Sequence, residues 1–178
     1  MAGNEEAASK LERTAIHEAA HAVVATMIHR GIVEEVFISD SPVDVAEIYD
    51  ELNSAVHGLT GGVRFRKIPT TVFENGLISY SGFFAECEHV YRSGGNLEVL
   101  LPQLREQASH DIDRYHALLV SEHLTEADIR NVVIDIGSAL KHYFDSGVWE
   151  AVTIVADALL ARGRLAGDEV LELLADFP

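Results

Sequence analysis

Residues 13–24 read R-T-A-I-H-E-A-A-H-A-V-V, and this stretch decides how the rest of the chain is interpreted. It contains an H-E-x-x-H motif made by His17, Glu18 and His21. On a helix this spacing puts both imidazoles on one face, one turn apart, where they can bind one zinc ion. The glutamate between them is placed to take a proton from a water molecule that the metal activates.

The segment around the motif has the pattern of a buried helix, because residues 14–28 are apolar almost all round apart from the motif and the terminal threonines. We expect this helix to begin near Lys10, at an S-x-x-E capping box, and to stop at Gly31. Buried ionisable groups cost free energy unless they are paired or bound to a metal. A zinc ion gives the three motif residues one common reason to lie there. The alternative is a pair of core histidines bonded to carbonyls, with Glu18 exposed.

A catalytic zinc ion needs a third protein ligand, since such sites use three ligands and leave one position for water. Aspartates and glutamates are too numerous in this chain to choose among by composition. The histidines left open as the third ligand are His57, His89, His110, His116, His123 and His142.

The composition narrows the classes of function. The chain has 178 residues and a formal net charge of −16, which disfavours DNA or RNA as a partner because an acidic surface repels phosphate. Cys87 is the single cysteine, so an intrachain disulfide and a four-cysteine zinc site are excluded. We see neither a signal-peptide pattern nor an apolar run long enough to cross a bilayer, and we expect a cytoplasmic protein without a membrane partner.

The remaining patterns predict a mainly α protein with a small β element. We expect one domain over 1–178, with a zinc-site part (1–124) and a helical C-terminal part (125–178). Glycines make 58–62 a predicted flexible turn, and 44–56 has helical spacing but stays ambiguous. Strands are predicted at 33–38 and 63–68, and helices at 74–91, 96–107, 109–121, 125–144, 149–162 and 168–175.

The opening segment resembles the zinc-binding helix of the peptidase domain of FtsH, the membrane-bound AAA protease, whose motif is HEAGH followed by alanine and an apolar run. Residues 81–86 (S-G-F-F-A-E) resemble the G-R-x-A-E-E helix of that family, and residues 108–112 (A-S-H-D-I) resemble its G-A-S-N-D-I/L segment. The strand at 33–38 and the stretch 159–170 agree in order as well. The resemblance covers most of the chain and implies an FtsH peptidase-like helical fold.

The resemblance assigns the third zinc ligand to Asp111, because the aspartate of the matching family segment has that role. A carboxylate near the start of a helix, just after the predicted cap Ser109, is also held favourably by the helix dipole, although without the resemblance a simple capping role is the preferred explanation. Glu86 is the alternative, either as a ligand or as the acceptor for an imidazole N–H on the far side from the metal. Asp113 is open to the same accepting role.

The chain departs from the family pattern at several positions. Ala20 replaces the glycine of the motif, Phe83 the arginine of the second segment, Cys87 its last glutamate, and His110 the asparagine before Asp111. There is no G-x-x-x-x-G-K-[ST] motif for an ATPase. ATP-driven unfolding and membrane anchoring are therefore not implied, and we expect a stand-alone peptidase-like domain.

These observations predict a zinc-dependent metalloendopeptidase in which Glu18 is the general base and the substrate is a peptide or an unfolded protein segment. The strand at 63–68 is either an edge for pairing with an extended substrate or a plain surface hairpin. A non-catalytic, zinc-stabilised interaction module is the alternative function, and a zinc-independent helical protein is the third. The resembled domain works in rings, so a homo-oligomer is open beside a monomer.

Overall fold

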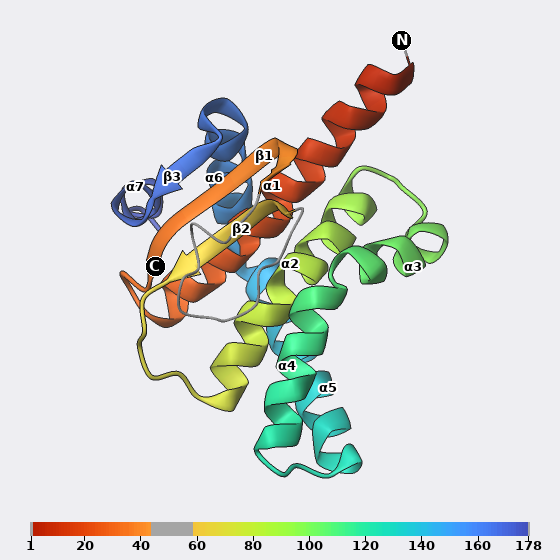
Figure 1. Ribbon diagram of the computed structural model, residues 1–178, viewed down its shortest axis with the longest axis vertical. Coiled ribbons are helices and arrows are strands. Elements are labelled where there is room, and N and C mark those ends of the chain that lie inside the picture. Colours follow the sequence, from red (N-terminus) through yellow and green to blue (C-terminus); the bar gives the residue numbers. More distant parts are fainter. Residues whose placement is uncertain (1, 44–58, 178) are drawn as a thin grey trace.

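The computed structural model describes residues 2–43 and 59–177, in which the chain is mainly helical with a small three-stranded antiparallel sheet (Figure 1). This agrees with the predicted fold class at that level. The elements in chain order are α1 (Ala2–Ile28), β1 (Val33–Val43), β2 (Leu59–Phe65), α2 (Val72–Arg92), α3 (Leu97–Gln107), α4 (Ser109–Ser121), α5 (Glu126–Tyr143), η2 (Phe144–Val148), α6 (Trp149–Arg162), β3 (Arg164–Ala166) and α7 (Gly167–Leu173).

Helix α1 is the element on which the others pack. It contacts α2, α6 and the strands β1 and β2, so neighbours surround it (Figure 1). Ala15, Ala19, Ala22 and Val23 are fully buried along it. Small side chains let the neighbouring backbones approach closely, which explains why this sequence forms a central helix. The prediction of a buried helix is confirmed.

The start of α1 differs from the prediction. The helix begins at Ala2 rather than near Lys10, so the predicted capping box lies inside it. Residues 2–8 contain alanines and two glutamates, which favour a helix and suit the positive end of its dipole. In Figure 1 this first part of α1 extends beyond the rest of the fold.

The sheet has the strand order β2-β1-β3 and is antiparallel throughout. Val36, in the central strand β1, pairs with Val63 of β2 and with Leu165 of β3. Strand β3 has only three residues and was not predicted, because so short a run carries no alternating pattern. The predicted helix over 44–56 lies outside the described residues.

Two glycines that predict a turn are instead inside β2. Gly61 and Gly62 pair with β1, and the strand begins at Leu59. A Cβ at Gly61 would lie 2.7 Å from Cγ of Glu18 and 2.8 Å from Cγ2 of Thr14. The glycine is therefore needed because the strand passes very close to α1 at the motif. In the sequence, a glycine required by close packing looks the same as a glycine of a flexible turn.

Most predicted helices are confirmed to within a few residues. Thr125 forms the predicted capping box with Asp128, and Asn96 caps α3. A capping box at Thr71 with Glu74 opens α2, which begins two residues earlier than predicted. The predicted cap by Ser109 is wrong, because α4 starts after Ala108 without a side-chain cap.

The C-terminal part shares the core of the N-terminal part. Helix α6 packs on α1, β3 pairs with β1, and α7 contacts both β1 and α6. Val23, Val36, Val155 and Leu159 belong to one cluster of buried apolar residues. None of the helices in the described ranges combines the length and apolar character that a membrane crossing requires.

Gly167 tests this packing of α7. A Cβ there would collide with the backbone carbonyl of Val33, which cannot move without disturbing the sheet. We predict that Gly167→Ala lowers the free energy of unfolding by about 1–3 kcal/mol, as overpacking does. Gly137→Ala is the control, since nothing lies within 4 Å of its Cβ position in α5, and it should stabilise by about 0.5–1 kcal/mol. Equal urea midpoints for the two variants would contradict this packing.

Candidate metal centre

His17, His21 and Asp111 converge on one point between α1 and α4. The Nε2 atoms of the two histidines are 2.9 Å apart, and Oδ2 of Asp111 lies 3.2 Å from His17 Nε2 and 3.4 Å from His21 Nε2. Tetrahedral zinc with bonds of about 2.0–2.1 Å places neighbouring ligand atoms roughly 3.3 Å apart. The three side chains therefore have nearly the spacing that one zinc ion requires.

The hydrogen bonds behind the two imidazoles determine which nitrogen faces this point. His17 Nδ1 lies 2.6 Å from Oε1 of Glu86, and His21 Nδ1 lies 2.6 Å from the backbone oxygen of Ile78. A carboxylate and a carbonyl only accept, so both Nδ1 atoms carry the proton in the neutral rings. Both Nε2 lone pairs then point toward each other and toward the Asp111 carboxylate.

When both rings are neutral, this arrangement places three acceptors together without a donor. A single proton can bridge two of the atoms, whereas a metal ion coordinated by all three satisfies every lone pair. Asp111 and Glu86 also bring two negative charges to the site, which a divalent cation balances. The donor set of two imidazole nitrogens and one carboxylate oxygen suits zinc.

Helix α2 supplies the groups that hold the two rings. Glu86 is only 3% exposed. It does not reach the point where the three ligand atoms meet, because it lies on the Nδ1 side of His17. The hydroxyl of Ser81 is fully buried, donates to the Ile78 carbonyl and lies 3.2 Å from Nδ1 of His21. Of the two roles open for Glu86, the geometry supports acceptor for an imidazole N–H.

Gly82 lets α2 approach the face of α1 that carries His17 and His21. A Cβ at this position would lie 2.5 Å from Nε2 of His17 and 2.6 Å from its Cδ2. Any side chain here would push the imidazole out of place. Sequence reasoning did not assign a role to Gly82, although a glycine in the interior of a helix is itself a signal of close packing.

Burial and charge perturb the ionisable groups of the site. Burial lowers the pKa of His17, but its hydrogen bonds to Asp111 and Glu86 outweigh this and raise the pKa well above its ordinary value. Burial raises the pKa of Asp111, but hydrogen bonds from His110, His17 and His21 lower it far below the usual range. Asp111 is therefore an anion, and its side chain is 32% exposed, so the site opens to solvent on that side.

Glu18 lies beside the triad without belonging to it. Its side chain is partly buried against β2 at Gly61. Burial raises the pKa of Glu18 above its ordinary value, because the carboxylate loses hydration, and this outweighs the opposing effect of the two histidines. A carboxylate that binds protons more readily than usual is a better general base near neutral pH.

The other candidate histidines lie away from the three-atom cluster. His57 is outside the described residues. His89 faces Glu12, His116 is hydrogen-bonded to Tyr80, His123 follows the end of α4 with a φ of 60°, and His142 is in the last turn of α5. His110 contacts Asp111 at 3.7 Å from the other carboxylate oxygen.

Asp113, which was open as an acceptor for an imidazole N–H, and Cys87, to which the sequence assigns no role, are not part of the site in the described structure. Asp113 is exposed on α4 and, within the described residues, makes no hydrogen bond or ion pair with either imidazole. Cys87 is half-buried, and burial raises the pKa of its thiol to about 12, so it stays protonated and is a poor metal ligand.

The chain matches no protein-family model and no curated protein. The likeness to the FtsH peptidase domain therefore stays a hypothesis drawn from short motifs, and the metal centre is argued from its own geometry.

Glu86→Gln tests the role of the buried carboxylate. The amide oxygen still accepts from Nδ1–H of His17, but the lost negative charge makes the imidazole a less basic ligand, so we predict a loss of about 10–100-fold in zinc affinity. Glu88→Gln is the matched control, because Glu88 lies on the same helix but pairs with Arg92. Competition with a chromophoric chelator measures both affinities, and an unchanged affinity in Glu86→Gln would show that the negative charge of Glu86 does not strengthen metal binding.

Proposed function

We propose that this chain is a zinc-dependent metallopeptidase that hydrolyses peptide bonds. The observation that carries the proposal is the convergence of His17, His21 and Asp111 on one point. Glu18 lies beside the two histidines on α1. Three protein ligands with an opening to solvent form the arrangement of a catalytic zinc site rather than a closed structural one.

The residues of the chain have distinct roles in this proposal. A bound zinc ion supplies Lewis acidity, which activates water and polarises the substrate carbonyl. Glu18 accepts the proton of the attacking water and passes it to the leaving amine. Glu86 and the Ile78 carbonyl hold His17 and His21 in the tautomer that binds the metal. Asp111 joins α4 to the site and brings the anionic ligand.

Strand β2 supports an extended peptide or an unfolded segment as the substrate. It is an outer strand of the sheet and passes beside Glu18 at Gly61. An extended chain that runs along such a strand is recognised through its backbone, which tolerates many sequences. A folded substrate does not offer a peptide in this form.

The motifs that resemble the FtsH peptidase domain support the same assignment. The residue that the resemblance assigns as third ligand, Asp111, is the one that the structure brings to the two histidines. It is 94 positions away from His17 in the sequence, so their meeting is not a local coincidence.

A non-catalytic module stabilised by zinc is the second candidate function. One observation favours it: the ligands come from α1 and α4, and both imidazoles are held by α2, so a metal ion would link three helices. Such a module has no need for Glu18, whose carboxylate lies outside the ligand set.

Glu18→Gln separates the two candidate functions. In the peptidase, loss of the general base should lower kcat for a fluorogenic peptide library by at least about 100-fold while zinc stays bound. A chelator should abolish the activity of the original protein, and added zinc should restore it. Equal cleavage by both proteins would refute the mechanism, and zinc binding without any cleavage would support the non-catalytic module.

A further inference from the structure

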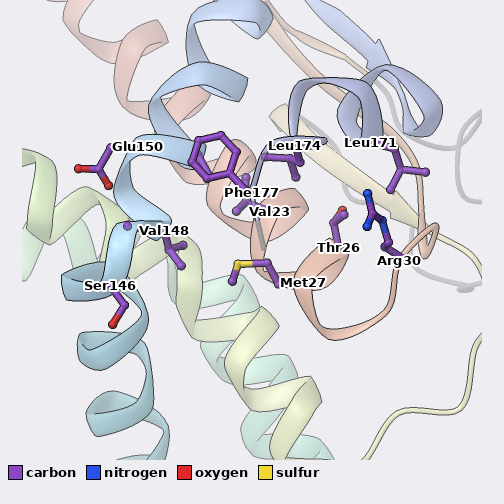
Figure 2. A pocket seen from close by; sticks show the side chains of 12 residues that line it. Val23, Thr26, Met27, Arg30, Ser146, Val148, Glu150, Leu171, Leu174 and Phe177 are labelled. Atoms are coloured by element: carbon purple, nitrogen blue, oxygen red, sulfur yellow. The ribbon is translucent and has the colours of Figure 1, made fainter.

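A cavity lies on the face of α1 opposite the candidate metal centre. It is partly open to solvent and has a volume of about 270 Å³ between the C-terminal end of α1, the junction of α5 with α6, and α7 (Figure 2). Val23 lines this cavity. Val23 follows His21 by two residues, so the two side chains are about 200° apart around the axis of α1. The cavity is thus separated from the metal ligands by the helix itself.

The lining is largely apolar and comes from segments far apart in sequence. Val23 and Met27 of α1 meet Val148 and Ala151 of the α5–α6 junction and of α6. The other side is closed by residues at the C-terminus, namely Leu171, Leu174 and Phe177. Such a concave, mostly apolar surface with a few polar groups is typical of small-molecule sites.

Thr26 is the polar residue in this cavity that the metal centre does not explain. Five polar or charged residues are buried in the described parts of the chain: His17, His21, Thr26, Ser81 and Glu86. The other four hold the metal position or the rings around it. Thr26 is only 5% exposed, and its hydroxyl has no hydrogen-bond partner within residues 2–43 and 59–177. The Thr26 hydroxyl is not among the fully buried unpaired side-chain atoms of these residues, so it keeps some exposure and is open to a ligand in the cavity.

Arg30 supplies a charge beside this hydroxyl. It follows Thr26 by four residues and therefore lies on the same face of α1, and Figure 2 shows both side chains at one end of the cavity. No ion pair or hydrogen bond engages its guanidinium among the described residues. In the same view the carboxylate of Glu150 is at the far end and points away, so it does not neutralise Arg30.

We propose that this cavity binds a small free carboxylic acid with an apolar body, such as a medium-chain fatty acid. The carboxylate accepts from the Arg30 guanidinium and from the Thr26 hydroxyl, and the hydrocarbon fills the space between Val23, Met27 and Phe177. The formal net charge of −16 repels anions in general, so binding of an anion here depends on this local pair of donors.

The volume sets the size of the ligand. A cavity of about 150 Å³ holds benzene, and drug-sized ligands occupy about 300–1,000 Å³. At about 270 Å³ the cavity suits a body of six to ten carbons, on the order of octanoate. Binding in this cavity requires neither zinc nor peptide hydrolysis, so its test is separate from the test of the proposed function.

Octanoate is the probe for the test, with 1-octanol and octylamine as controls of the same length. We expect saturable one-to-one binding of octanoate with a Kd of about 1 mM or tighter. Octanol and octylamine should bind at least about tenfold more weakly, because octanol carries no negative charge to pair with Arg30 and protonated octylamine is repelled by it. Amide shifts in two-dimensional NMR should concentrate in the last turns of α1, at the start of α6 and in α7.

Three substitutions locate the binding. Arg30→Gln and Thr26→Val should each weaken octanoate binding, the first by about tenfold or more, and leave octanol unchanged. Arg130→Gln is the matched control, since Arg130 is an exposed arginine on α5 that also has no partner among the described residues. Met27→Trp fills the cavity from a side chain that is 42% exposed, so it should abolish binding without unfolding the protein.

The proposal is overturned by any of three results. These are octanol binding as tightly as octanoate, unchanged octanoate binding in folded Arg30→Gln, and NMR shifts that map elsewhere. A peptide such as N-acetyl-Ala-Phe carries the same carboxylate, and tighter binding of that peptide than of octanoate would show that the site takes a polypeptide C-terminus instead of a free acid.

Discussion

Two imidazole lone pairs and one carboxylate oxygen face a single point between α1 and α4, with no hydrogen-bond donor among them. Without a metal ion one proton can bridge only two of these three atoms, and hydrogen bonds to α2 hold each ring in place from behind. The close approach of α2 at Gly82 and of β2 at Gly61 follows from the same constraint, since both glycines leave room for motif side chains. These close approaches of α2 and β2 to α1 therefore surround the side chains that meet at this point.

Two opposite faces of helix α1 carry different kinds of side chain. One face presents His17 and His21 to α2 and α4, and the opposite face presents Val23 and Thr26 to the cavity beside α7. Small residues between these faces keep the helix tightly enclosed. Ala20, which replaces the glycine of the FtsH motif, is fully buried, so the fold accommodates its methyl group.

How much of the structure could be predicted from the sequence depends on whether each feature is set by neighbouring residues or by residues far apart in the chain. The motif at 17–21 is local, because helical geometry alone sets two side chains one turn apart, and capping residues such as Thr125 are local too. Asp111 was reached through resemblance, since no local rule joins it to a helix 94 residues away. The partner of His21 is the backbone oxygen of Ile78, which any residue type could supply, so the sequence does not indicate it.

Two predictions about the fold were wrong. Gly61 was misread as part of a turn because a glycine that permits close packing looks like one that permits flexibility. The start of α1 was misplaced because a local capping signal was overridden by a continuing helix.

Zinc K-edge absorption spectroscopy on protein loaded with one equivalent of zinc tests the central claim most directly. The account predicts one tightly bound zinc per chain, with four nitrogen or oxygen neighbours at about 2.0–2.1 Å and the outer-shell pattern of two imidazoles. No sulfur should appear at about 2.3 Å, because the Cys87 thiol stays protonated. Failure to retain zinc at neutral pH, or a shell of six oxygens without imidazole, would contradict the account.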